Sequence, residues 1–378
     1  MRIGVICYAS VGGSGVVATE LGHALAARGH DVHLISSEHP FRWRPAPRLA
    51  FEAVDVPAYP LFREPQYLLA LANTLVRLSV ERRLEILHAH YAVPHATAAY
   101  LAHQILEAEL GHHAPRTVTT LHGTDITLVG SDPSYARVVA FSIEQSHGVT
   151  AVSESLKKDT LRALGIQREI RVIPNFLDTA VYARRPDPAL RGRLCPPGCA
   201  GVVVHVSNFR PVKRVGLVVE VFRRVRERLP ARLVLVGDGP DRPDVERRIA
   251  ALGLTADVDV VFEQQDLVPW LSSADVFLLT SSQESFGLAA LEAMACGTPV
   301  VAARVGGLPE IIDDGRTSFL CGPEDASAMA ARVTELLENP ARRESIGRAS
   351  ALDTAKRFSE DDVVPRYEAY YQHVLGRR

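Results

Sequence analysis

The chain has 378 residues, with 42 Lys and Arg against 44 Asp and Glu, and a formal net charge of -2. Such a chain has no global positive field for gripping nucleic acid or an anionic membrane, so we expect neither partner. No apolar run approaches the roughly 20 residues that span a bilayer, and the first residues resemble a strand and not a signal peptide, which predicts a cytoplasmic protein.

Short apolar runs alternate with longer helical patterns, which predicts βα units and parallel sheets. The strands predicted in the first half are residues 2–8, 31–36, 51–55, 85–89, 117–122 and 148–152. Those predicted in the second half are residues 201–206, 232–236, 258–262, 276–279, 300–302 and 319–320. Helical patterns fill the intervals, and a last helix is predicted over residues 359–373.

The length exceeds the size at which one core usually divides, which predicts two domains. Periodicity breaks at residues 173–178 and in the Pro- and Arg-rich residues 184–201. We therefore expect Rossmann-like domains over residues 1–172 and 173–358, with residues 359–378 packing back on the first domain.

Five cysteines, an odd number in so long a chain, indicate reduced thiols and not a disulfide framework. Cys195 and Cys199 flank a Pro-Pro-Gly turn, but no second ligand pair completes a zinc site. His88 and His90 share a strand face, yet no cysteine or carboxylate is placed to complete a metal site with them. We expect stacking and hydrogen bonding from these histidines, and no metal.

Glu284 and Glu292 stand eight positions apart across the start of an apolar helix. A helix N-terminus can receive a phosphate, and carboxylates on either side can accept hydrogen bonds from sugar hydroxyls. The backbone amides at this N-terminus belong to Phe286, Gly287 and Leu288. The alternative is a surface helix with incidental glutamates, and the turn and apolar strand at residues 296–301 disfavour it.

Polar loops follow other predicted strands at their carboxyl ends, where parallel sheets bind ligands. Asn208, Arg210 and Lys213 follow the strand at residues 201–206, although solvated loop charge is the usual role of such cations. His122 lies at the carboxyl end of the strand predicted at residues 117–122, and its place beside Gly and Thr favours function over a structural role.

The first strand leads into a glycine-rich turn containing Gly13 and Ser14. Its pattern also matches the dinucleotide fingerprint, with Glu38 as a ribose partner, so a nicotinamide-dependent oxidoreductase is a competing interpretation. The match is weak evidence, because strand-to-helix turns of Rossmann domains favour glycine generally.

Together these motifs resemble the family 4 retaining glycosyltransferases, over essentially the whole chain. The resemblance implies the GT-B fold, an α/β architecture of two Rossmann-like domains whose parallel sheets face a central cleft. Five runs resemble the members that transfer N-acetylglucosamine from UDP-GlcNAc to L-malate in bacillithiol biosynthesis: residues 88–96, 121–127, 142–146, 174–176 and 207–214. The resemblance implies that reaction without a cofactor, and it is compatible with a homodimer.

The resemblance also implies roles for individual residues. Arg210, Lys213 and the amides at residues 286–288 would stabilise the leaving phosphate. The other donor contacts would come from Glu292 to the ribose, Glu284 to the sugar ring, His122 near the anomeric carbon, and from Gly13 and Asn208. Separately from the resemblance, a dicarboxylate acceptor requires cationic or multiple hydrogen-bond partners, and we expect Arg63 as the cation, with Tyr91, Thr120 and the Gly13–Ser14 amides as neutral donors. The alternative is that Arg63 is an ordinary surface arginine and Tyr91 packs in the core.

Other functions stay open at this stage. Related family members use an inositol phosphate acceptor, which is the nearest alternative. A sugar-nucleotide-binding protein without catalysis is an alternative of another class. The D-x-D sequence at Asp257 and Asp259, a metal motif in many sugar-nucleotide enzymes, enters an apolar strand and is interpreted as structural.

Overall fold

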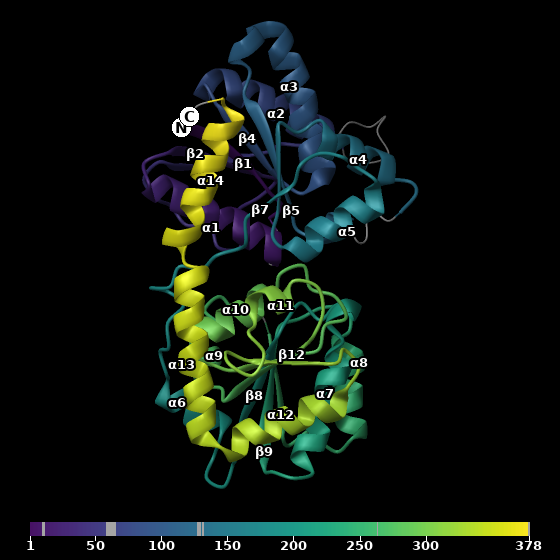
Figure 1. The fold of residues 1–378 in the computed structure, drawn as a ribbon, viewed down its shortest axis with the longest axis vertical. Helices are drawn as coiled ribbons and strands as arrows, with labels where there is room; N and C mark the ends of the chain where they lie inside the picture. The colour runs from purple at the N-terminus through teal and green to yellow at the C-terminus, as the bar shows by residue number, and fades with distance from the viewer. Residues whose placement is uncertain (10–11, 58–65, 127–129, 131, 263, 377–378) are drawn as a thin grey trace. The chain divides into compact units, whose positions relative to one another are not determined.

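The computed structural model describes the chain except residues 10–11, 58–65, 127–129, 131, 263 and 377–378 (Figure 1). The chain forms two compact units. Unit 1 comprises Met1–Phe176 and Asp361–Arg378, and unit 2 comprises Leu177–Glu360. The division predicted from the sequence follows residue 172, and the chain leaves unit 1 after Phe176.

Unit 1 is a parallel sheet between helices. In chain order it contains β1 Arg2–Ile6, α1 Gly13–Ala27, β2 Asp31–Ser36, β3 Leu49–Ala53, α2 Tyr67–Arg82, β4 Ile86–His90, η1 Ala92–Ala96, α3 Thr97–Leu110, η2 Gly111–His113, β5 Arg116–Leu121, α4 Ala136–Glu144, β6 Gly148–Ala151, α5 Glu154–Leu164, β7 Arg171–Val172 and, from the end of the chain, α14 Glu360–Val374. Within the described residues the strand order is β3-β2-β1-β4-β5-β6-β7, and neighbouring strands are parallel.

The two faces of this sheet follow from the period-2 alternation of strand side chains. Ile3 and Val5 of β1 pack in one core with α1 and α14. Ile6 of the same strand packs in a second core with α2 and α3. Because both faces are covered, β1 is apolar in every position after Arg2 except Gly4.

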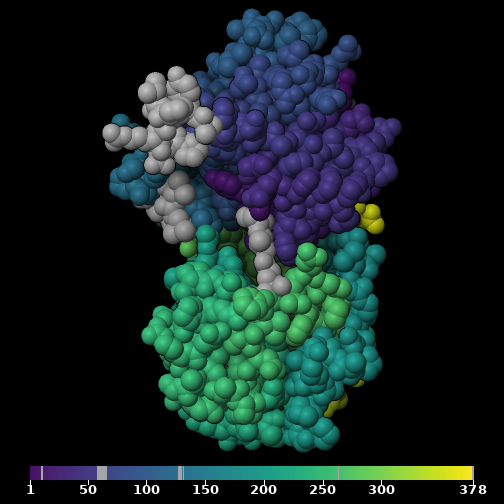
Figure 2. All heavy atoms as spheres, turned by 180° about the vertical axis from the view of Figure 1, so that it is seen from behind, coloured from purple at the N-terminus to yellow at the C-terminus, as the bar shows by residue number. Residues whose placement is uncertain are grey.

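The C-terminal helix α14 is part of the core of unit 1. Tyr367, Tyr370 and Tyr371 are buried there with Val363 and Val364. The Tyr370 hydroxyl donates to the carbonyl of Val149 in β6 at 3.1 Å. The C-terminal residues, drawn yellow, lie on the side seen in Figure 1 and are almost hidden in the view from behind (Figure 2).

Unit 2 repeats the architecture. In chain order it contains α6 Pro188–Leu194, β8 Gly201–Val206, η4 Pro211–Lys213, α7 Val215–Arg226, β9 Ala231–Val236, α8 Arg242–Ala251, β10 Val258–Val261, α9 Val268–Ser272, β11 Val276–Leu279, α10 Leu288–Ala295, β12 Val300–Ala303, α11 Leu308–Ile311, β13 Phe319–Cys321, α12 Ala326–Glu338 and α13 Pro340–Arg357. The strand order among the described residues is β10-β9-β8-β11-β12-β13.

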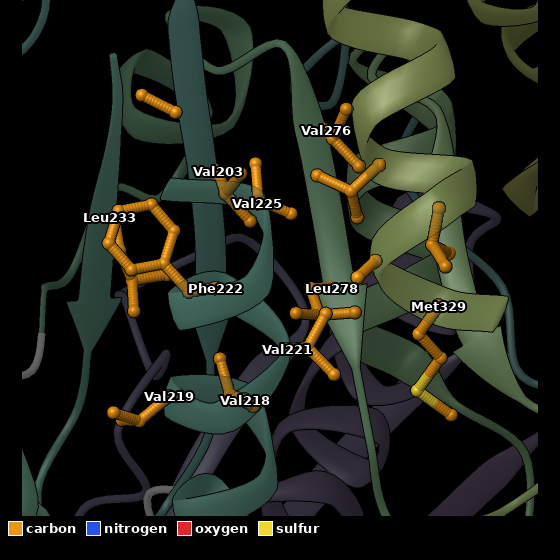
Figure 3. Packing of buried hydrophobic residues seen from close by; sticks show 14 of the residues in the cluster. Val203, Val218, Val219, Val221, Phe222, Val225, Leu233, Val276, Leu278 and Met329 are labelled. Atoms are coloured by element: carbon orange, nitrogen blue, oxygen red, sulfur yellow. The ribbon is translucent and has the colours of Figure 1, made fainter. Parts of the chain in front are cut away.

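One core of unit 2 forms between its sheet and helices α7, α8 and α12. The α7 side chains of Val218, Phe222 and Val225 face the sheet, where Val203 and Leu233 are buried beside them (Figure 3). Helices α9, α10 and α13 lie on the opposite face of this sheet (Figure 1). The prediction of two Rossmann-like parallel sheets is confirmed.

The prediction that all cysteines are reduced is wrong for one pair. Cys195 and Cys199 form a disulfide across the Pro-Pro-Gly turn between α6 and β8. The turn brings their Cα atoms to 5.3 Å, within the range that a disulfide can bridge. Cys7, Cys296 and Cys321 are buried free thiols. In the part of the chain that the structure describes, no helix is long and apolar enough to cross a membrane.

Phe222 tests the packing of unit 2, because its side chain is fully buried. We expect Phe222→Ala to lower the free energy of unfolding of unit 2 by about 3–5 kcal/mol, through lost burial and the cavity left behind. Urea unfolding is followed by Trp270 fluorescence in a Trp43→Phe background, so that only unit 2 reports. The control is Leu352→Ala, which truncates a side chain that is 72% exposed. Equal effects of the two truncations would contradict this assignment of the core.

Candidate functional site

Each sheet reverses its strand order at one place. In unit 1 the chain builds β2 and β3 outward from one side of β1 and then places β4 on the other side. In unit 2 the corresponding neighbours are β8 and β11. Ligands of open α/β sheets bind beside the carboxyl ends of the strands at such a switch point.

The loop after β8 presents predicted donor residues. Asn208 and Arg210 are exposed, while Phe209 between them is fully buried with a φ of 34°. This loop lies against the turn after β9: a Cβ on Gly237 would meet the carbonyl oxygen of Ser207 at 1.9 Å. The close approach requires glycine, since any side chain there would displace the loop.

Lys213 and Glu284 come together at the switch point of unit 2. Lys213 Nζ lies 2.6 Å from Glu284 Oε1, and the two side chains are 22% and 11% exposed. The Ser281 hydroxyl donates to the same carboxylate oxygen at 2.8 Å. The two residues are separated by 71 positions in the sequence, and the adjacency of β8 and β11 brings their loops together.

Hydrogen bonds fasten these two loops to each other. The Thr280 hydroxyl donates to the carbonyls of Lys213 and Arg214, at 3.2 and 3.0 Å. The Ser282 amide donates to the Val212 carbonyl at 2.9 Å. The Lys213–Glu284 pair is therefore held on a fixed backbone.

Helix α10 begins as the sequence predicts. Gly287 caps it with φ 97° and ψ 50°, and a Cβ at this position would lie 2.5 Å from a methyl group of Leu308. Phe286 is buried before the cap, and Glu292 is buried inside the helix, 3% exposed. The backbone carbonyl of Glu284 accepts from the Gly307 amide at 2.8 Å.

His205 of β8 supports the loop that follows this strand, and this role was not predicted from the sequence. Its Nδ1–H donates to the Leu278 carbonyl at 2.8 Å, so its Nε2 accepts from the Ser207 hydroxyl, also at 2.8 Å. Burial lowers the pKa of His205 to about 4, so the ring is neutral at pH 7. A histidine in an otherwise apolar strand is the signal that could have revealed it.

The glycine-rich turn of unit 1 leads into α1. Gly12 is the N-cap residue, Gly13 is exposed with open space around it, and Ser14 is buried in the first turn. Glu38, the ribose partner in the oxidoreductase interpretation, is exposed just beyond the end of β2.

A buried polar network connects β4, β5 and α14. His88 lies between Tyr371 and Thr120: its Nδ1 is 2.8 Å from the Tyr371 hydroxyl and its Nε2 is 2.7 Å from Thr120 Oγ1. Thr120 Oγ1 also shares a hydrogen bond with Thr150 Oγ1 at 2.6 Å. Thr120 is fully buried. Its predicted contact with the acceptor is not supported; the structure places Thr120 as a support for His88.

His122 lies, half-buried, at the carboxyl end of β5 and contacts the buried His90. His90 Nδ1 and His122 Nε2 share a hydrogen bond at 2.9 Å, with the rings stacked. Asp125 fixes the backbone of this loop, because its carboxylate accepts from the amides of Gly123 at 2.8 Å and Ala92 at 3.2 Å. Burial raises the pKa of Asp125 to about 6, against the opposing effect of these amides.

Tyr91 follows β4 and has a positive φ of 96°, which is strained for a residue with a side chain. Its ring lies 5.6 Å from that of His122 and 5.5 Å from that of Tyr8. Tyr91 therefore lies near His122, at the carboxyl ends of β4 and β5. Arg63, the predicted acceptor cation, lies outside the described residues.

The carboxylates of the D-x-D sequence form structural ion pairs. Asp257 pairs with Arg226 and Asp259 with Arg232, each at 2.9 Å. Among the described residues, no group of three His, Cys, Asp or Glu side chains is placed to hold a metal ion.

Comparison with known proteins shows the family and the fold to which the chain is similar. Residues 11–181 match the Glycosyltransferase Family 4 family, and residues 195–353 match Glycosyl transferases group 1. Sucrose-phosphate synthase from Thermosynechococcus elongatus has a similar structure, with a TM-score of 0.81, 23% identity and 99% of each chain covered. HepE of Anabaena, solved with UDP-glucose, gives a TM-score of 0.80 and 19% identity, covering 99% of this chain and 100% of HepE.

Two named relatives are similar to this chain over almost its whole length. N-acetyl-alpha-D-glucosaminyl L-malate synthase from Bacillus anthracis is 41% identical over 99% of this chain and 97% of its own. D-inositol 3-phosphate glycosyltransferase from Xylanimonas cellulosilytica is 28% identical over 97% of this chain and 93% of its own. The chain therefore belongs to the family 4 glycosyltransferases, and it is an enzyme with the GT-B fold.

The buried histidines of unit 1 predict a pH-dependent stability. Burial lowers the pKa of His88 and His122 to about 3 and of His95 to about 4, and lowers that of His90 well below its usual range. Below about pH 6.5 the unfolded chain binds protons that the folded chain excludes, so the free energy of unfolding falls as the pH drops toward about 4. Asp125 opposes this, because its raised pKa lets the folded state bind a proton first, but four imidazoles outweigh one carboxyl.

We expect unit 1 to lose on the order of 1–2 kcal/mol per buried histidine between about pH 7.5 and pH 5. The measurement is the urea midpoint reported by Trp43 in a Trp270→Phe background. An equal or higher midpoint at the lower pH would show that these imidazoles are protonated in the folded protein.

Proposed function

We propose that this enzyme transfers N-acetylglucosamine from UDP-GlcNAc to the hydroxyl of L-malate with retention of the α configuration. The observation that carries the proposal is the 41% identity, over nearly the whole chain, to a relative named for this product. The pairing of Lys213 with Glu284 at the switch point of unit 2 supports the proposal. A sugar nucleotide bound there needs a cation for its diphosphate and a group that accepts hydrogen bonds from its sugar hydroxyls.

The main catalytic demand is stabilisation of the leaving UDP. Breaking the anomeric C–O bond develops negative charge on the β-phosphate and positive character on the sugar. Arg210, Lys213 and the amides at the start of α10 supply fixed positive potential to that phosphate. The departing phosphate oxygen then takes the malate hydroxyl proton on the same sugar face, which accounts for retention without an enzymic nucleophile.

The remaining donor contacts are assigned by chemistry. Glu292 binds the ribose hydroxyls, Glu284 the hydroxyls of the sugar ring, and Asn208 the phosphate region. Neutral His122 orients the GlcNAc near its anomeric carbon; a protonated imidazole there would repel the developing positive charge.

The acceptor carries two carboxylates, which require cationic or multiple hydrogen-bond partners when they leave water. We assign Arg63 as the cation, with Tyr91 and the Gly13–Ser14 amides as neutral donors. Binding of the acceptor by unit 1, a homodimeric assembly and a cytoplasmic location stay predictions.

The nearest alternative acceptor is an inositol phosphate, which the names of more distant relatives contain. Acceptor-dependent UDP release from UDP-GlcNAc separates the two. We expect release with L-malate and a much lower rate with inositol 3-phosphate. A preference for the inositol phosphate would overturn the acceptor assignment. UDP release with neither acceptor, despite binding of UDP-GlcNAc, would point to an acceptor other than these two.

Lys213 tests the donor chemistry. We expect Lys213→Ala to slow transfer by about 3–4 kcal/mol in activation free energy, since a positive charge at the leaving phosphate is most favourable in the transition state. The measurement is turnover at saturating substrates, with an unchanged melting temperature as the folding control. Turnover within about threefold of the unmodified enzyme, less than 1 kcal/mol, would remove Lys213 from the catalytic role.

A further inference from the structure

The Lys213–Glu284 ion pair joins two side chains that bind different parts of the donor under the proposed function. Lys213 faces the diphosphate and Glu284 faces the sugar ring. In the structure their charged atoms are instead 2.6 Å apart, with the Ser281 hydroxyl on the same carboxylate oxygen. The Glu284 carboxylate is therefore paired with the Lys213 ammonium group that the diphosphate would need.

The carboxylate of Glu284 interacts oppositely with the two halves of a sugar nucleotide. It repels the diphosphate and competes with it for Lys213. It also accepts hydrogen bonds from sugar hydroxyls, and a charged acceptor makes these bonds stronger than neutral ones. UDP-GlcNAc offers both interactions, whereas free UDP offers only the unfavourable one.

We propose that Glu284 discriminates the sugar nucleotide from the nucleoside diphosphate product by competing for Lys213. This inference rests on the proposed function, since it takes a UDP-sugar as the donor. With UDP-GlcNAc bound, sugar hydroxyls satisfy Glu284 and Lys213 turns to the diphosphate. After transfer the sugar has left, Glu284 recaptures Lys213, and UDP is released more readily.

The backbone around the pair suits such an exchange. Thr280 and Ser282 hold the Lys213 loop, and the Gly307 amide holds the Glu284 carbonyl. A Cβ on Gly306 would meet that same carbonyl oxygen at 1.8 Å, so the chain is packed closely behind Glu284. Only side-chain rotation is needed to break and reform the pair, and the long lysine side chain provides it.

The test is isothermal titration of UDP and of UDP-GlcNAc, without acceptor, into the unmodified enzyme and Glu284→Gln. Gln keeps the shape and loses the charge. We expect the dissociation constant for UDP to fall by about fivefold, the size of effect that a modest ion pair has. The constant for UDP-GlcNAc should stay or rise, so the preference for the sugar nucleotide over UDP is lost. Unchanged or weaker UDP binding would overturn the inference.

A double-mutant cycle separates competition for Lys213 from simple charge repulsion. In a Lys213→Ala background, Glu284→Gln should no longer tighten UDP binding. Equal tightening in both backgrounds would overturn the competition. The charge-matched control is Glu344→Gln, which removes a carboxylate paired with Arg348 on the surface of α13 and should leave both constants unchanged. If UDP does not bind the unmodified enzyme, the proposed function itself fails, and the inference with it.

Discussion

The constraint on which both candidate sites depend is the reversal of strand order in a parallel sheet. Between β8 and β11 the crossover helices diverge, and two loops are left side by side at the carboxyl edge. This adjacency, and no local sequence feature, brings Lys213 to Glu284. The same reversal between β1 and β4 places Tyr8 beside Tyr91. A fold of this kind supplies the site's geometry before any ligand binds.

The two sites solve different electrostatic problems. In unit 2 the Lys213 ammonium and the Glu284 carboxylate lie side by side, and such groups are suited to a phosphate and to sugar hydroxyls. Unit 1 instead keeps His88 and His90 buried and His122 half-buried, all three neutral because burial lowers their pKa values. The network reaches α14 through Tyr371, so the last helix of the chain supports the buried His88 of β4.

Most of the fold could be predicted from the sequence, because strands buried on both faces give apolar runs with clear ends. β2, β8 and β11 occur with the predicted bounds. The strand β7, only Arg171–Val172, is too short to leave such a signal. The start of α10 was predictable because an apolar helical run begins after Gly287, between Glu284 and Glu292.

The contacts within the sites were less predictable. Tyr371 and His88 are separated by 283 positions, and no local pattern reports such a pairing. Thr120 lies in the strand predicted at residues 117–122, but its burial depends on which face of the strand it occupies and on what packs there. The Cys195–Cys199 disulfide was missed because an argument from the number of cysteines ignores a turn that brings two thiols together.

In the proposed mechanism the enzyme retains the α configuration by stabilising the leaving diphosphate, without an enzymic nucleophile. The most direct test of retention is proton NMR of the product formed from UDP-GlcNAc and L-malate, with the linkage read from the anomeric proton as the reaction proceeds. We expect a single α-linked GlcNAc–malate product, formed in step with UDP release. A β-linked product, or free GlcNAc released ahead of the conjugate, would contradict it.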